Sequence, residues 1–215
     1  MPNIHSIYKT MRMKKHNIPQ EILAALGFDC ADLKIDSRDT KHTFGLLVKI
    51  NDLLTVEQKY AIMEQQGCHK TGKMNEASKK FAAKYADKSL AERLRIMSSK
   101  EEASYPEFAE EDAPYLNDDG TLSLAVRCYV GDINGVLRSC HCLDRNYKAE
   151  FKSFIEEHPD KILSFSQFFC GCCAAHAKHH LQNKLDVKLK LKSIDTSPVK
   201  TDNGNKRVFT YEIVK

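Results

Sequence analysis

Several features typical of common protein classes are missing from this sequence of 215 residues. No apolar run approaches the ~20 residues that a membrane-spanning helix requires. The basic first residues, MPNIHSIYKTMRMKKHN, contain no apolar segment, so we expect no secretory signal. Neither a glycine-rich phosphate loop nor a Gly-x-Ser-x-Gly elbow is present, and these are the usual signatures of nucleotide binding and serine hydrolysis. Internal repeats and low-complexity segments are also lacking.

A strong charge is missing as well. The formal net charge of +4 is too small to indicate a nucleic-acid partner. The basic run KLDVKLKLKS has lysines at alternate positions, as on the solvent face of a strand at a sheet edge. No aromatic residues are interleaved with these lysines to stack on bases. We therefore expect no nucleic-acid partner and no membrane span, while a homodimer is compatible with the sequence.

Cysteine, in contrast, is abundant, with eight residues in the chain. Without an export signal, so many thiols indicate a reducing compartment, and we expect the protein to be cytoplasmic. In that setting clustered cysteines are metal ligands or redox groups more often than a disulfide framework. A disulfide framework is the alternative if a leader has been removed.

The chain up to about Lys100 has the apolar period of helices. The segment TVEQKYAIMEQQG begins with the capping residue Thr55 and ends at Gly67. Further helices are expected in IPQEILAALGF, MNEASKKFAAKYADK and SLAERLRIM. The acidic segment EEASYPEFAEEDAPYLNDDG, with two prolines, indicates a linker or lid over residues 101–120.

From Thr121 onward the apolar period changes to two, which is typical of strands. TLSLAVRCYV is expected to form a strand, GDING a turn and GVLRSCHCL the partner strand of a hairpin. Two helices should follow, NYKAEFKSFIEEHP and one that begins at Cys170, and then two strands, DVKLKLKSI and KRVFTYEIV. The inward residues of the first of these helices are Tyr147, Phe151, Phe154 and Ile155.

This order of elements predicts an α+β fold. A helical N-terminal half, residues 1–100, packs with a C-terminal antiparallel sheet of about four strands that is covered by helices. The domains expected are a helical region over residues 1–100, an acidic linker or lid over 101–120 and a ligand-binding-like domain over 121–215, although all three can form one continuous domain.

The last part of the chain resembles a known module. CGCCAAHAKHHLQNKLDVKLKLKSI followed by RVFTYEI looks like the closing segment of the vinyl-4-reductase-type domain, and is similar to uncharacterised bacterial proteins in which a cysteine pair precedes a Cys-x-Cys helix start. The likeness covers roughly the last 90 residues. It implies a small-molecule-binding α+β fold, related to haem-nitric-oxide sensors and Golgi transport-complex subunits, and it implies no particular reaction. Val208 stands near the position of a cysteine that is common in the family.

Two cysteine clusters carry the candidate chemistry. On a strand, Cys140 and Cys142 of SCHC would point to the same face, because side chains alternate with period two. The CGCC stretch adds Cys170 and Cys172, at the start of a helix. Only one helix and a short return separate the clusters, so they can come together. Four thiolates suit a tetrahedral zinc site, and we predict zinc bound by these four cysteines.

Other residues are reserve ligands or reactive groups. Cys173, which shares the spacing of an apolar stripe facing the core, is the reserve fourth ligand if Cys172 turns away. His176 lies on the stripe of Cys172, and Cys68 is a further candidate. The other two histidines of HAKHH are more often simply exposed on such a helix, and the glycine of CGCC allows a tight turn.

Three function classes remain open. The first is a small-molecule-binding or sensing protein with a zinc-binding cysteine cluster, whose apolar pocket takes a small hydrophobic or aromatic ligand. The second is an enzyme that uses a thiolate of CGCC for redox or hydrolytic chemistry. The helix N-terminus would favour that thiolate, and His176 or His141 would be the base. In the third class the cysteines merely pack.

Overall fold

The computed structural model describes residues 4–29, 36, 39–66, 72–99, 113–127, 132–133, 137–138, 141–196 and 206–214. The chain divides into two compact units, each made of segments that are distant in the sequence. The first comprises residues 1–68, 128–175 and 198–200, and the second residues 69–127, 176–197 and 201–215. Helix α8 (Ile162–Leu185) contributes its first part to one unit and its last part to the other. The domain boundaries expected near residues 100 and 120 stay a prediction.

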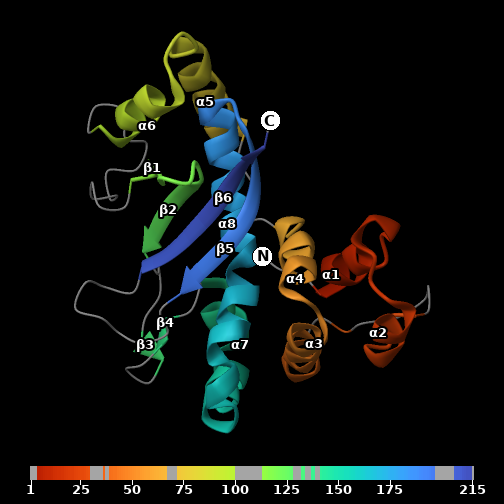
Figure 1. The fold of residues 1–215 in the computed structure, drawn as a ribbon. Helices are drawn as coiled ribbons and strands as arrows, with labels where there is room; N and C mark the ends of the chain where they lie inside the picture. Colours follow the sequence, from red (N-terminus) through yellow and green to blue (C-terminus); the bar gives the residue numbers. More distant parts are fainter. Residues whose placement is uncertain are drawn as a thin grey trace. The chain divides into compact units, whose positions relative to one another are not determined.

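The first unit is built mainly from helices. Its described elements are α1 (Ile4–Met11), the 3-10 helix η1 (Lys14–His16), α2 (Gln20–Ala25), α3 (Thr40–Leu53), α4 (Val56–Glu64), the short strands β3 (Asp132–Ile133) and β4 (Leu137–Arg138), α7 (His141–Glu157), η3 (Pro159–Lys161) and the start of α8 (Figure 1). The cap predicted at Thr55 is confirmed. Its hydroxyl accepts from the backbone N–H of Gln58, and the Gln58 side chain accepts from the backbone N–H of Thr55. This reciprocal capping satisfies N–H groups that the first turn of α4 leaves without helical partners.

Aromatic side chains fill the centre of the first unit. The ring of Phe44 on α3 lies 5.9 Å from that of Phe154 and 6.4 Å from that of Phe151, both on α7. It also lies 5.3 Å from the ring of Phe165 on α8. These tilted and edge-on pairs add roughly 0.5–1.5 kcal/mol each beyond the burial of their apolar area. The predicted inward face of α7, including Tyr147, is confirmed.

The second unit combines helices with a sheet. Its described elements are α5 (Gly72–Lys84), α6 (Leu90–Ser98), the last part of α8, and the strands β1 (Tyr115–Leu116), β2 (Leu122–Arg127), β5 (Lys188–Thr196) and β6 (Lys206–Val214). The strands form a four-stranded antiparallel sheet in the order β1-β2-β6-β5 (Figure 1). The predicted α+β class is confirmed. In the part of the chain that the structure describes, no helix is both long enough and apolar enough to cross a membrane.

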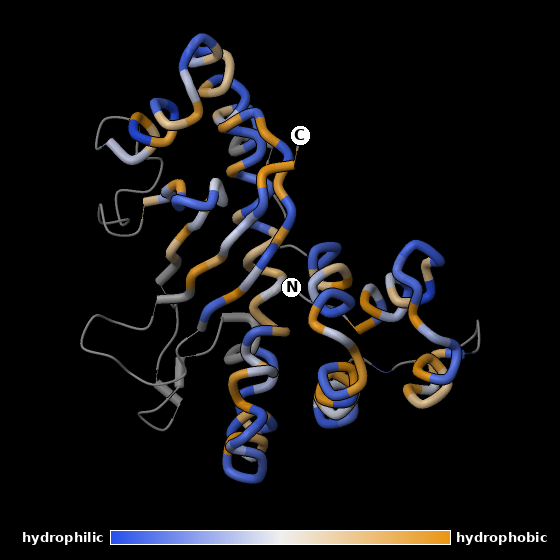
Figure 2. The backbone as a smooth tube through the Cα atoms, in the orientation of Figure 1, coloured by the Kyte–Doolittle hydropathy of each residue, from blue (hydrophilic) through white to orange (hydrophobic). Residues whose placement is uncertain are grey.

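A bulge sets the buried face of β5. Leu191 pairs with Tyr211, and Ser193 pairs with Thr210, the neighbour of Tyr211 in β6. Lys192 is therefore an extra residue in β5. An extra residue shifts the alternation of side chains by one position. Ile194, three residues after Leu191, is therefore buried on the same side. Figure 2 shows the resulting mixture of hydrophilic and hydrophobic positions along β5 and β6.

The pairing expected within residues 121–143 is wrong. β2 pairs with β6 and β1, and β4 pairs instead with β3, which lies in the segment expected to be a turn. β1 itself comes from the expected linker. His141 and Cys142 of SCHC belong to α7, which begins at His141, and not to the expected strand. Local alternation identified strand residues here, but the choice of partner depends on which segments meet in space.

Candidate metal site on helix α8

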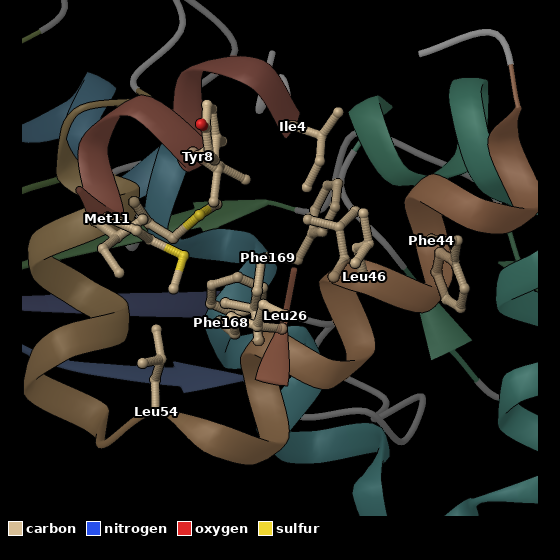
Figure 3. Packing of buried hydrophobic residues seen from close by; sticks show 14 of the residues in the cluster. Ile4, Tyr8, Met11, Leu26, Phe44, Leu46, Leu54, Phe168 and Phe169 are labelled. Atoms are coloured by element: carbon tan, nitrogen blue, oxygen red, sulfur yellow. The ribbon is translucent and has the colours of Figure 1, made fainter. Parts of the chain in front are cut away.

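Helix α8 begins well before the CGCC stretch. The helix starts at Ile162, directly after η3, which has Pro159 at its first position. The signal that sequence reasoning missed is the spacing of Phe165, Phe168 and Phe169, which places three rings on one face of a helix. All three are buried, and Figure 3 shows Phe168 and Phe169 within the apolar core of the first unit. The predicted start at Cys170 is therefore wrong.

The earlier start removes the environment that would favour a reactive thiolate. Cys170 is the ninth residue of α8, and the influence of the helix dipole falls off within the first turn. Cys170 and Cys172 expose 4% and 0% of their surface. A thiol so deeply buried, away from a helix end, receives no help from the dipole in losing its proton. The expectation that a helix N-terminus activates these thiols is wrong.

The burial of Cys172 and Cys173 is the reverse of that expected. Cys172 belongs to the apolar core, whereas Cys173 is only half-buried and packs against that core. The reason is the aromatic stripe upstream. Cys172 follows Phe168 by four residues and Phe169 by three, so it continues the face that these rings bury. The expectation for Cys173 rests on the spacing of the residues after the cysteines, where a different face of the helix is buried.

Helix geometry also decides which thiols can act together. At 3.6 residues per turn, Cys170 and Cys172 point about 160° apart, while Cys170 and Cys173 are about 60° apart. Side chains three residues apart have Cβ atoms about 5–6 Å from each other. The pair that can share an ion is therefore Cys170 with Cys173, and the expected reserve ligand replaces Cys172. The glycine between them, Gly171, is inside the helix and forms no turn.

The other half of the predicted zinc site lies largely outside the described residues. This applies to Cys140 and to the reserve candidate Cys68. Cys142 belongs to α7, so the argument that placed it on a strand is wrong, and its side chain is not described. The stretch of residues 128–175 that contains both clusters belongs to the first unit. The convergence of SCHC with CGCC stays a prediction.

Three half-buried histidines follow in the part of α8 that belongs to the second unit. The ring centroids of His176 and His180 are 4.5 Å apart, with the ring planes at 71°. His179 Nε2 lies 2.8 Å from Asn75 Oδ1 on α5 and 2.8 Å from Asn183 Nδ2, one turn further along α8. The expectation that His179 is simply exposed is wrong. Asn75 precedes His179 by 104 residues, and no local pattern joins the two.

Within the described residues, no three side chains of His, Cys, Asp or Glu are grouped so that they could hold a metal ion. A metal site that includes described side chains therefore uses at most two of them, together with donors that lie outside the described part of the chain. Comparisons with models of protein families, with characterised proteins and with solved structures find no match to the chain. The chemistry of α8 is consequently the basis for assigning a function.

Proposed function

We propose that the protein binds a thiophilic divalent ion, with zinc the natural candidate, through Cys170 and Cys173 of α8. The observation that supports this proposal is the placement of two thiols on adjoining turns of one face, with Cys170 buried and Cys173 half-buried against the aromatic core. A disulfide requires Cβ atoms about 3.5–4.5 Å apart, closer than the ~5–6 Å of residues three apart in a helix. Two sulfurs bound to one zinc ion, each at about 2.3 Å, tolerate the wider spacing.

Cys140 and Cys142 are the other two ligands in this proposal, as predicted from the sequence. Four thiolates would close the coordination sphere of zinc and leave no position for a substrate. Such an ion stabilises the fold, because its binding free energy contributes to folding when no preformed site exists in the unfolded chain. A structural or regulatory role for the ion therefore accords with the proposal better than a catalytic one.

The ligand-binding part of the proposal rests on the resemblance to the vinyl-4-reductase-type domain. It holds that the protein takes a small hydrophobic or aromatic molecule and that the cysteine-bound ion stabilises the module that binds it. The aromatic side chains of the first unit, such as Phe165 beside α7, are of the kind that lines sites for such molecules. A thermal-shift screen with small aromatic compounds tests this part alone. A panel without any shift would remove it and leave the metal proposal standing.

The test of the metal proposal is a comparison of three alanine variants. The full chain is purified under reducing conditions, and its zinc content is measured by mass spectrometry. Cobalt(II) substitution then reports thiolate ligation through charge-transfer absorption. Cys170→Ala and Cys173→Ala should each lower the bound zinc and the charge-transfer band. Cys172→Ala is the matched control, because it lies on the same helix but faces the core, and it should retain both.

Two results would overturn the metal proposal. One is wild-type protein that binds neither zinc nor cobalt with its thiols reduced. The other is an equal effect of all three variants, which would show that the metal signal follows the stability of the helix and not the identity of the ligands. Circular dichroism of each variant separates the second result from loss of folding.

A further inference from the structure

The closest pair of rings on the last part of α8 is His176 and His180. Residues four apart on a helix lie one above the other on the same face, with Cβ atoms about 5–6 Å apart. The measured ring separation of 4.5 Å with nearly perpendicular planes shows that the two imidazoles meet edge to face. Both side chains are half-buried, and Nε2 of His180 is shielded from solvent.

The third histidine of the group has a different role. His179 is held from two sides by amides, with Nε2 2.8 Å from Asn75 Oδ1 and 2.8 Å from Asn183 Nδ2. When Nε2 of His179 carries a proton it donates to Asn75 Oδ1, and when it does not it accepts from Asn183 Nδ2. This nitrogen is therefore hydrogen-bonded in either tautomer. His179 therefore ties α8 to α5 within the second unit. Its ring, 5.6 Å from that of His180, also limits the movement of His180.

The spacing of His176 and His180 is the one by which helices supply two histidines to zinc. Neutral imidazole suits Zn²⁺, Ni²⁺ and Cu²⁺. In hydrolytic sites of this spacing a glutamate follows the first histidine and acts as general base. Ala177 occupies that position here and has no titratable group. The chemistry of the pair is therefore ion binding without activation of water by a neighbouring carboxylate.

The charges on α8 allow a cation at this face. Lys178 lies about 160° around the helix from both His176 and His180, so its charge is on the opposite side. Lys184 is one turn beyond His180 and thus closer, but its Nζ lies 5.4 Å from the centroid of the Phe81 ring on α5. That contact directs the ammonium group toward an aromatic face.

We propose that His176 and His180 form a two-histidine chelate for a divalent ion such as Zn²⁺ or Ni²⁺. This site is separate from the thiol site of the proposed function and belongs to the second unit. Its two protein ligands leave coordination positions open, which water or a donor from a bound molecule fills. The amides around His179 position the helix and do not bind the ion.

The test uses the full chain with reduced thiols, its histidines labelled with ¹⁵N, and Zn²⁺ alone as the probe. On titration, the ring nitrogens of His176 and His180 should shift together and saturate at the same concentration. His176→Gln and His180→Gln should each weaken this binding by about 10- to 100-fold, a range that loss of even an outer partner of a ligand produces. His42→Gln, which removes an exposed histidine on α3 of the first unit, is the control and should change nothing.

The thiol variants separate the two sites. In the double variant Cys170→Ala/Cys173→Ala, the shifts of His176 and His180 should persist with the same saturation point. Loss of the shifts in that variant would overturn the inference, because the histidines would then serve the thiol site. Wild-type protein in which the two histidines do not shift, or shift no more than His42, would also overturn it. These last two outcomes are measured on wild-type protein, so neither depends on whether a histidine variant folds.

Discussion

Gly171 of α8 and Met63 of α4 approach so closely that a β-carbon on residue 171 would lie 2.6 Å from Met63 Cβ. Carbon atoms in contact prefer separations of about 3.5–4.0 Å, so no side chain fits at this position without movement of the helices. Both residues belong to the first unit. The glycine of CGCC therefore allows α8 to pack against α4, and it sits between the two thiols proposed to bind zinc.

Replacing this glycine tests the close approach. Gly171→Ala should lower the free energy of unfolding, because overpacking costs about 1–3 kcal/mol and the gain in helix propensity recovers only about 1 kcal/mol. Gly45→Ala is the matched control on α3, since a β-carbon there meets nothing within 4 Å. It should raise the free energy of unfolding by about 0.5–1 kcal/mol. Urea unfolding of both variants checks the opposite signs, and two shifts of the same sign would contradict the packing argument.

A buried amide provides a second prediction. Gln66 Nε2, after the end of α4, donates to Thr10 Oγ1 on α1 at 3.2 Å, and both side chains are buried. Thr10→Val keeps the shape of the side chain but removes the acceptor. The free energy of unfolding should fall by about 1–3 kcal/mol, because the buried amide loses one partner and keeps only the longer hydrogen bond, 3.5 Å, to the carbonyl oxygen of Ile62.

The control for this prediction is the double variant Thr10→Val/Gln66→Leu. It replaces both polar groups by apolar ones, so its free energy of unfolding should be closer to that of the wild type than that of Thr10→Val. Simple addition of the two single-variant effects would show that the pair is not coupled.

In the second unit, a guanidinium group completes the end of α8. Arg93 of α6 donates from Nη1 to the backbone carbonyl oxygen of Leu185 at 2.6 Å. Leu185 is the last residue of α8, where carbonyl groups lack helical partners. Arg93→Gln should lower the free energy of unfolding by about 1.5–3 kcal/mol, the usual range for a hydrogen bond to a charged group. Arg95→Gln, an exposed position of the same helix, is the control and should stay within about 0.5 kcal/mol of the wild type.

Asp119 provides a prediction about pH. The pKa of this carboxyl is lowered, first by the hydroxyl of Thr121, and then by the ammonium group of Lys192 and the backbone N–H of Thr121. A carboxyl with a lowered pKa in the folded state stabilises the protein above its ordinary pKa, and this effect is lost as the pH falls toward the folded value. Asp119→Asn should therefore reduce the urea midpoint at pH 7.

The difference between wild type and Asp119→Asn should narrow as the pH falls below about 4, where the carboxyl of the unfolded chain takes up its proton. Asp118→Asn, at the exposed neighbouring position, is the control for the loss of one negative charge. A gap in urea midpoint that is the same at pH 7 and at pH 3 would show that the carboxylate contributes nothing through its ionisation.

Much of the fold could be predicted because its causes are local. Thr55 caps α4 through a residue only three positions away, and the inward face of α7 follows from spacings of three and four residues. The candidate site was harder to place. Cys170 and Cys173 are neighbours only if both lie inside a helix. Their placement therefore depends on where the helix begins. The aromatic spacing upstream contained that information, but the break at Pro159 obscured it.

The sequence by itself determined most of the helices and the strands β2, β5 and β6, since apolar period, capping residues and alternation act within a few positions. Only the tertiary structure decided that the buried side of α8 changes along the helix, from the side of Phe168 and Cys172 to that of Leu181 and Leu185. It also decided that Asn75 meets His179 and that β2 pairs with β6. The physical reason is that burial and pairing are settled between segments distant in the chain. For such segments, local patterns leave several partners equivalent, and the free energy of packing and hydrogen bonding selects among them.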